Sequence, residues 1–239
     1  MEVTVQEKVN IVISDEQHEV VKNHLSVRKI DGEEKFVVKK PTRVNKNKMF
    51  LFIKRAFDIA LSVFCILIFA IPSALIAICV AVSSKGPVFY SQKRLGKNGV
   101  EFDIYKFRTM VSDAEKDGAV WAKKDDDRVT TVGVILRKTH LDEIPQFWNI
   151  LKGDMSFVGP RPERKVFYDE FESYIVGFSH RLYVKPGLTG WAQINGGYEL
   201  KPEEKVAWDV EYIEKQSLLI DLKCVLNTYK LLFGDDKAR

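Results

Sequence analysis

Two adjacent carboxylates, Asp142 and Glu143, are the strongest candidates for chemistry in this chain. They stand in RKTHLDEIPQFWNIL, where Pro145 suits the first turn of a helix because an amide hydrogen is not needed there. The pair is therefore expected at a helix N-terminus, where free backbone amides and the helix dipole favour carboxylates and phosphates. Adjacent acids can divide the labour: one attacks or transfers a proton while the other holds a divalent cation. A capping box formed by Thr139 and Asp142 is the structural alternative.

Basic residues supply the context for this pair. Lys106 and Arg108 alternate with aromatic residues in YKFRTM, so on a strand both would face one side. Arg137 precedes the acidic pair, and the prolines around Arg161 stiffen its backbone, which preorganises a guanidinium for phosphate or for stacking on a base. Each residue alone is usually a surface charge, but together with the acids they predict a site for a diphosphate and a metal ion. The predicted substrate-binding residues are Lys106, Arg108, Arg137, Pro160, Arg161 and Pro162.

A second acidic run, Asp125–Asp127, contains the Asp-x-Asp spacing of many nucleotide-sugar glycosyltransferases. It lies beside Lys123, Lys124 and Arg128 with no apolar strand ahead of it, so a solvated loop is the preferred interpretation. The sequence has no Gly-rich phosphate loop ending in Lys-Ser/Thr and no dinucleotide-binding fingerprint. Its histidines lack ligand spacing.

The most unusual element is an uncharged apolar run at residues 59–82, IALSVFCILIFAIPSALIAICVAV. A bilayer core needs about 20 such residues in a helix, and this run has no polar face. Pro72 breaks it near its centre, and both flanks are basic. Because positive residues mark the cytoplasmic side, these flanks favour a re-entrant helix over a kinked spanning one. Asp58 is expected to pair with Lys54 or Arg55 at the interface, or to be an ordinary polar helix-end residue.

Composition fits one globular domain with a membrane segment. The chain has 239 residues and a formal charge of +4. Its basic residues cluster around the apolar run, which favours anionic lipid headgroups over nucleic acid as their partner. Cys65, Cys79 and Cys224 lack metal-ligand spacing and imply no disulfide framework, which fits a reduced cytoplasmic setting.

The remaining patterns predict an α+β, mostly helical fold. A β-hairpin is expected around Gly96–Gly99, and the apolar spacing after Leu141 predicts a helix that stops at Gly153. Further helices are expected near 163–178, 202–216 and 219–233, and the last has an apolar face that suits a membrane interface or core packing. The expected divisions are a variable, poorly ordered or loosely attached extension (1–47, with strand patterns in VTVQEKVNIVI and EKFVVKK), a membrane segment with its basic flank (48–84), a catalytic domain (85–233) and a tail (234–239).

Five segments in order resemble one family: KRAFDIALS, GPVFYSQKRLG, YKFRTM, LRKTHLDEIPQFWNILKGDMSFVGPRPE and KPGLTGWAQING. From about residue 50 to 233 the chain is similar to the bacterial sugar transferases that are monotopic polyprenyl-phosphate phosphoglycosyl transferases. The resemblance implies transfer of a sugar-1-phosphate from a UDP-sugar to undecaprenyl phosphate, with release of UMP. It also implies a place on the cytoplasmic face of the cell membrane and a role in starting exopolysaccharide or capsule glycans.

The resemblance also implies roles for single residues. Asp142 matches the nucleophile that forms an aspartyl phosphosugar, and Glu143 matches the residue that holds magnesium on the diphosphate. Arg161 matches a position near the nucleotide. Lys106, Arg108 and Arg137 match basic positions near the phosphates, and Lys54, Arg55, Asp58 and Pro72 match the membrane anchor. The family usually has Ser-Pro at the helix break, whereas this chain has Ile71-Pro72 and so lacks a hydroxyl that would bond the freed backbone.

Two other hypotheses make different predictions. A metal-dependent glycosyltransferase using Asp125–Asp127 would release UDP, and a membrane adaptor without enzymatic activity would release no nucleotide. Galactose, glucose and N-acetylated sugars are all compatible with the sequence, and a homo-oligomer is left open.

Overall fold

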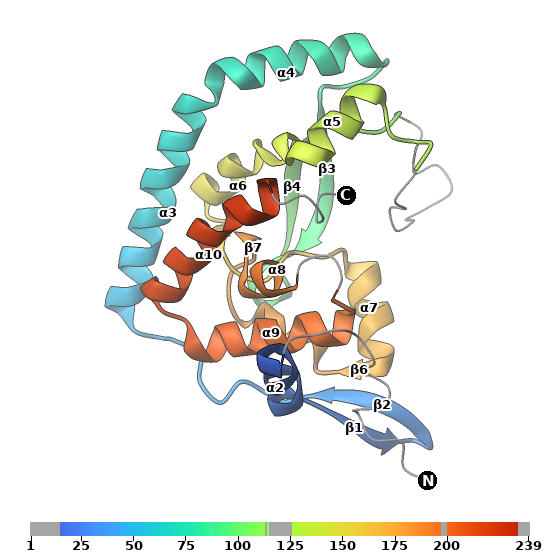
Figure 1. Ribbon diagram of the computed structural model, residues 1–239, viewed down its shortest axis with the longest axis vertical. Helices are drawn as coiled ribbons and strands as arrows, with labels where there is room; N and C mark the ends of the chain where they lie inside the picture. The colour runs from blue at the N-terminus through green and yellow to red at the C-terminus, as the bar shows by residue number, and fades with distance from the viewer. Residues whose placement is uncertain (1–14, 113, 115–125, 197–199, 234–239) are drawn as a thin grey trace.

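The computed structural model describes residues 15–112, 114, 126–196 and 200–233. The pattern VTVQEKVNIVI, Asp125 and the tail lie outside these residues. The predicted α+β, mostly helical fold is confirmed: helices make up most of the body, short sheets accompany them, one of which projects at the end near the N-terminus, and a long bent helix arches over one side (Figure 1). The arch consists of α3 (Lys48–Ile68) and α4 (Ala70–Ser83).

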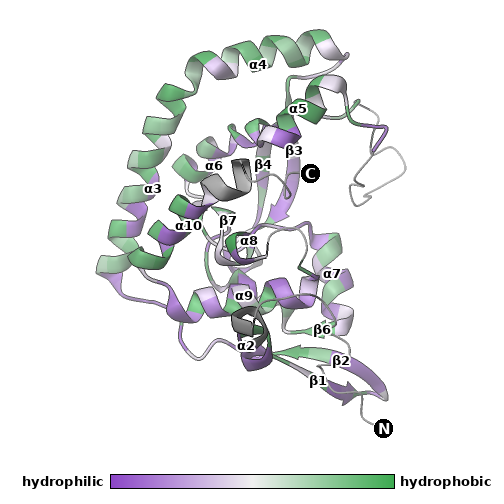
Figure 2. Ribbon diagram, viewed as in Figure 1, coloured by the Kyte–Doolittle hydropathy of each residue, from purple (hydrophilic) through white to green (hydrophobic). Residues whose placement is uncertain are grey.

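The bend between α3 and α4 has a local cause. Pro72 follows Ile68 by four residues and has no N–H for the Ile68 carbonyl, so α3 ends there. The chain turns at Phe69, whose N–H bonds the Cys65 carbonyl and whose own carbonyl accepts from the Ser73 N–H, both at 2.8 Å. Among the described residues no single helix passes for a membrane span, but this pair, bent by 61°, does so together by length and composition. Both helices are predominantly hydrophobic in Figure 2.

The segments that carry the acidic pair and Lys106 follow the arch. The predicted hairpin is confirmed, and the helix stops at Gly153 as expected, with the left-handed φ of 97° that glycine tolerates. A side chain at Gly133 would approach the Thr109 carbonyl oxygen to 2.0 Å, so α5 packs directly on the backbone that leaves the hairpin. The elements are β3 (Phe89–Leu95), η1 (Lys97–Gly99), β4 (Glu101–Phe107), α5 (Thr131–Thr139), η2 (Leu141–Glu143) and α6 (Gln146–Lys152).

Gly159, which follows β5 (Ser156–Val158), and Gly187, at the start of β7 (Gly187–Thr189), lie against each other. These two strands pair in parallel. A Cβ on Gly187 would approach the Gly159 nitrogen to 2.1 Å, so only glycine allows this spacing. The short helix α8 (Trp191–Asn195) follows β7.

The late helices are confirmed with small changes in their bounds. The predicted helices correspond to α7 (Lys165–Tyr174), α9 (Pro202–Lys215) and α10 (Leu218–Phe233), and η3 (Phe178–Tyr183) lies between α7 and α9. The core gathers around α9, where Val206, Ala207, Val210 and Ile213 are almost fully buried.

The prediction of a loosely attached extension is wrong for residues 15–38. They form α2 (Asp15–His24), β1 (Leu25–Ile30) and β2 (Glu33–Val38), and β2 pairs in parallel with β6 (Ile175–Val176). Val21, Leu25 and Val38 belong to the same buried cluster as residues of α7 and α9. The polar composition concealed a few apolar residues that bury against α9.

Candidate active site

The acidic pair lies on a tight turn between two helices. His140 ends α5 in the left-handed conformation (φ 55°), and η2 follows it directly. Asp142 is 6 % exposed and Glu143 is 8 % exposed. The alternative capping box does not form, because the Thr139 hydroxyl donates back to the Ile135 carbonyl at 2.8 Å. Pro145 precedes α6, so the acids lie just ahead of that helix, close to the predicted place.

Cations from two other segments meet this pair. Lys106 Nζ on β4 donates to Glu143 Oε1 at 2.7 Å and lies 3.7 Å from Asp142 Oδ2. Arg161, in the loop after β5, donates to both oxygens of the Glu143 carboxylate. The fold therefore brings Lys106, Arg161 and both acids together from β4, η2 and the Pro-Arg-Pro loop.

The neighbouring carboxylates have opposite electrostatic environments. Burial raises the pKa of Asp142 above its usual value, and the nearby Lys106 only partly offsets this. Burial also acts on Glu143, but Arg161 and Lys106 outweigh it and hold the pKa of Glu143 well below its usual range. Adjacent acids with separated proton affinities are typical of sites that assign different roles to two carboxylates.

Arg108 does not join this site. β4 ends at Phe107, so the expectation that Arg108 shares a strand face with Lys106 is wrong. Its guanidinium is buried and donates to the carbonyls of Pro87 at 2.6 Å, Ser84 at 2.6 Å and Val80 at 3.2 Å. Arg108 therefore caps the C-terminal end of α4, whose last carbonyls have no partner within the helix.

Arg137 and the second acidic run are also bonded elsewhere. Arg137 Nε donates to Thr109 Oγ1 at 3.0 Å. Arg128 binds the Asp126 carboxylate through Nε at 2.8 Å and Nη2 at 2.6 Å, so this carboxylate is part of an ion pair rather than a free metal ligand. Within the described ranges no group of three or more His, Cys, Asp or Glu side chains could hold a metal ion by itself.

The predicted anchor residues bind the protein body. Asp58 is buried and accepts from Ser156 Oγ at 3.1 Å and from the Phe157 N–H at 3.0 Å. The expected pairing of Asp58 with Lys54 or Arg55 is therefore replaced by contacts with β5, which leads into the Pro-Arg-Pro loop. The reason is that this face of α3 lies against protein rather than against water or lipid headgroups.

Lys54 and Arg55 reinforce the same docking. Lys54 Nζ forms a buried ion pair with Asp221 Oδ2 at 2.6 Å and also donates to the Val158 carbonyl at 3.1 Å. Arg55 donates to the carbonyls of Ile150 at 2.6 Å and Leu151 at 2.7 Å, at the end of α6. Helix α3 thus holds both β5, which leads into the Pro-Arg-Pro loop, and α6, which follows the acidic pair.

Sequence reasoning missed Asn149, which fixes α6 against β4. Its side chain accepts from the Tyr105 N–H at 3.0 Å and donates to the Asp103 carbonyl at 2.7 Å. These bonds set the acidic pair relative to Lys106. The available signal was a polar residue on the apolar face of a short helix.

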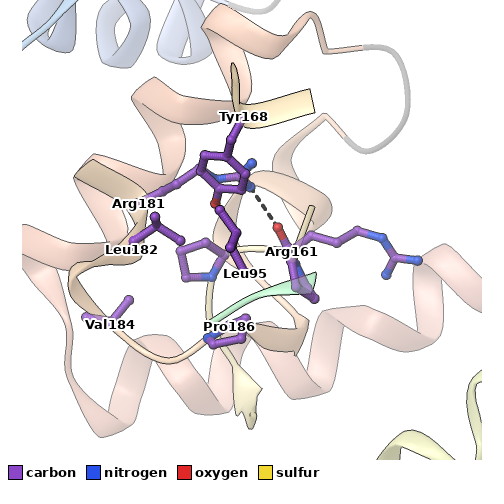
Figure 3. Close-up of a pocket in the computed structure, with 9 residues that line it drawn as sticks. Leu95, Arg161, Tyr168, Arg181, Leu182, Val184 and Pro186 are labelled. Carbon is purple, nitrogen blue, oxygen red and sulfur yellow. Dashed lines mark hydrogen bonds between the residues drawn. The ribbon is translucent and has the colours of Figure 1, made fainter. Parts of the chain in front are cut away.

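Arg181 was missed as well. Leu95, Tyr168 and Pro186 lie around a closely packed space beside the Pro-Arg-Pro loop that is too small to hold a water molecule. Figure 3 shows Arg181 among these residues donating to the Arg161 carbonyl at 3.0 Å, while the Arg161 side chain extends away from them. These residues therefore support the backbone of the loop, and the Arg161 side chain meets Glu143 outside them.

Comparison with known proteins relates the chain to enzymes that act on undecaprenyl phosphate. The family model for bacterial sugar transferases matches residues 49–235. The chain is 41 % identical over 194 residues to the UDP-N-acetylgalactosamine-undecaprenyl-phosphate N-acetylgalactosaminephosphotransferase of Aeromonas hydrophila, covering 80 % of this chain and 46 % of that protein.

Two UDP-glucose:undecaprenyl-phosphate glucose-1-phosphate transferases are similar too. The Escherichia coli protein is 42 % identical over 181 residues, covering 74 % of this chain and 39 % of that protein. The Caulobacter vibrioides protein is 39 % identical over 190 residues, covering 77 % and 71 %. The chain spans less than half the length of the Aeromonas and Escherichia relatives. With the family model matching most of its length, the chain belongs to the bacterial sugar transferase family.

Proposed function

We propose that this protein transfers a sugar-1-phosphate from a UDP-sugar to undecaprenyl phosphate. The observation that carries the proposal is the buried Asp142-Glu143 pair with Lys106 and Arg161 bonded to Glu143. Such cations can receive a diphosphate that an anionic nucleophile would otherwise repel. The relatives' names supply the class of donor and acceptor.

Asp142 is the nucleophile in this proposal. Its carboxylate attacks the phosphorus next to the sugar, the bond to the UMP oxygen breaks, and UMP leaves with the electron pair. The resulting aspartyl phosphosugar is then attacked at the same phosphorus by an oxygen of the lipid phosphate, which releases Asp142. The covalent route divides one transfer between two bulky anions into two steps. The weak contact of Asp142 with Lys106, at 3.7 Å, leaves its oxygens available for attack.

Glu143 would hold a magnesium ion together with the donor phosphates. The donor set fits, because Mg²⁺ prefers oxygen ligands and usually binds through one or two carboxylates plus phosphates and water. When bound, the ion would neutralise charge on the diphosphate. Glu143 suits this role because Arg161 and Lys106 keep it ionised.

The test is identification of the nucleotide product with membranes, magnesium and a panel of UDP-sugars. Wild type should release UMP, and Asp142→Asn should lose about a thousandfold or more in rate because the nucleophile is gone. Asp127→Asn is the matched control, since Asp127 is exposed, and it should retain the wild-type rate. Release of UDP, or UMP release by Asp142→Asn at the wild-type rate, would contradict the mechanism. The panel also identifies the sugar.

The apolar outer surface supports a membrane location. Leu67, Ile71 and Val82 on the arch are more than two-thirds exposed, and Leu219 and Leu226 on α10 are also exposed. We propose that α3 and α4 enter the bilayer from the cytoplasmic face and return to it, with α10 at the same interface. The product would then start a lipid-linked glycan, such as an exopolysaccharide or capsule, on that face.

Single cysteines distinguish re-entry from a span. In a background without Cys65, Cys79 and Cys224, Lys46→Cys and Lys85→Cys are placed at the two ends of the arch. Both should resist a membrane-impermeant maleimide added outside intact cells and react after permeabilisation. Labelling of one position from outside would show a spanning helix instead.

A further inference from the structure

The backbone of the Pro-Arg-Pro loop is bonded at every carbonyl from residue 160 to residue 163. Proline has no N–H, so these carbonyls provide most of the loop's hydrogen bonding. Their donors come from three separate elements, β3, η3 and β7. The bonds are Gly187 N–H to Pro160 at 2.9 Å, Arg181 Nη2 to Arg161 at 3.0 Å, Arg94 Nη1 to Pro162 at 3.4 Å and Leu95 N–H to Glu163 at 3.0 Å.

Arg181 holds the centre of this loop from inside the core. Its side chain is 3 % exposed and forms an ion pair with Asp209, which is 2 % exposed, at 2.7 Å. The guanidinium also lies over the Phe178 ring, 5.0 Å from its centroid. Burying two charges is costly, and well-packed apolar residues often stabilise a core equally well. A role beyond core stability therefore accounts better for this pair.

Arg94 holds the same loop through the two residues that follow Arg161. It lies on β3, pairs with the Glu163 carboxylate at 3.1 Å and reaches the Pro162 carbonyl. The loop is consequently fixed on both sides of Arg161, while the Arg161 side chain extends to Glu143.

We infer that Arg94 and Arg181 are positioning residues that fix the backbone of Arg161, so that its guanidinium is presented to the diphosphate of the donor. The expected effect on donor binding rests on the proposed function, whereas the bonds that fix the loop do not depend on it. Among the described residues, neither Arg94 nor Arg181 forms a hydrogen bond with the acidic pair. Both therefore act on the site through Arg161. Preorganisation of this kind lowers the cost of binding a flexible, charged substrate.

The first experiment measures the loop without substrate. The double variant Arg181→Met/Asp209→Leu removes the ion pair without leaving a buried charge, so it should fold. Amide hydrogen exchange at Gly187 and Leu95, which donate to the loop, should become about tenfold faster or more. His24→Ala is the matched control, because it breaks a contact with Glu214 (3.2 Å) at the far end of α9 and should leave these amides unchanged. Unchanged exchange in the double variant would overturn the inference whatever reaction the protein performs.

The second experiment separates positioning from simple stabilisation. The double variant should raise KM for the UDP-sugar about tenfold, with a smaller change in kcat. Introduced into Arg161→Ala, the same two substitutions should raise KM little further, because their effect passes through Arg161. Arg94→Met should behave alike, with a smaller effect because its contact with the loop is longer. If the effects on KM were additive, Arg181 would only stabilise the core, and the inference would be wrong. If wild type released no UMP, the proposed function would be wrong, but the result of the hydrogen-exchange experiment would remain valid.

Discussion

Two regions of this molecule contain the same pair of groups, a lysine bonded to a buried carboxylate. In the N-terminal half of α3, here called the foot of α3, Lys54 Nζ lies 2.6 Å from Asp221 Oδ2. At the acidic site, Lys106 Nζ lies 2.7 Å from Glu143 Oε1. Distance and charge therefore do not distinguish a structural pair from a functional one. The surroundings of each pair do.

The pair at the foot of α3 is saturated by protein groups. Lys54 also donates to the Val158 carbonyl, and the second Asp221 oxygen accepts from the Tyr212 hydroxyl at 2.7 Å. At the acidic site Lys106 and Arg161 likewise bond the Glu143 carboxylate, but the adjacent Asp142 lies beyond hydrogen-bond distance of Lys106, and burial raises its pKa. The two regions therefore differ in this second buried carboxylate, because a buried charge without enough partners is a candidate for ligand binding or chemistry.

The largest effect on stability is expected from Lys54→Ala. The change leaves Asp221 buried without its cation, which should lower the free energy of unfolding by about 3–5 kcal/mol. Thermal or chemical unfolding in lipid nanodiscs measures it. Lys48→Ala on the same helix is the control, since Lys48 is exposed and should change stability by less than about 0.5 kcal/mol. If both variants changed the free energy of unfolding equally, the ion pair between Lys54 and Asp221 would not stabilise the fold.

A smaller loss of stability, about 2–3 kcal/mol, is expected from Arg108→Ala, because three carbonyls at the end of α4 lose a charged donor. KM for the donor should stay near the wild-type value, in contrast to Arg161→Ala, which should raise it. The result decides whether Arg108 is a structural residue, like Lys54, or a substrate-binding residue, like Lys106 in the proposed site. A large rise in KM with unchanged unfolding would return Arg108 to the substrate-binding group that the sequence predicted.

The sequence predicted those parts of the fold that local patterns determine. The β-hairpin, the stop at Gly153 and the last helices follow from turn residues and apolar spacing within single segments. The sequence also predicted that Lys106 lies near the acidic pair, because their charges are opposite, and the structure shows this contact. Docking of residues 15–38 depended on a few apolar side chains that meet α9 only in the folded chain.

The direction of long charged side chains was the least predictable feature. Lys106 and Arg108 are two residues apart, yet one meets Glu143 and the other caps α4, because β4 ends between them. Asp58 likewise bonds β5 rather than its basic neighbours on α3. The partners of Arg108 and Asp58 include backbone groups distant in sequence, which spacing alone does not reveal.

Among the variants that remove a buried contact, Lys106→Met is expected to change stability least, and it tests the other side of the comparison. Methionine keeps most of the volume, and Glu143 keeps Arg161 as a partner, so the free energy of unfolding should change by less than about 1 kcal/mol. Donor affinity should fall about tenfold or more, because the proposed site loses one of the two cations that would receive the diphosphate. Lys54→Met should give the opposite pattern, with weakened folding and nearly unchanged affinity per folded molecule. If the two methionine variants lost stability to the same extent and bound donor equally well, the neighbouring carboxylate without enough partners, Asp142, would not separate a functional ion pair from a structural one in this molecule.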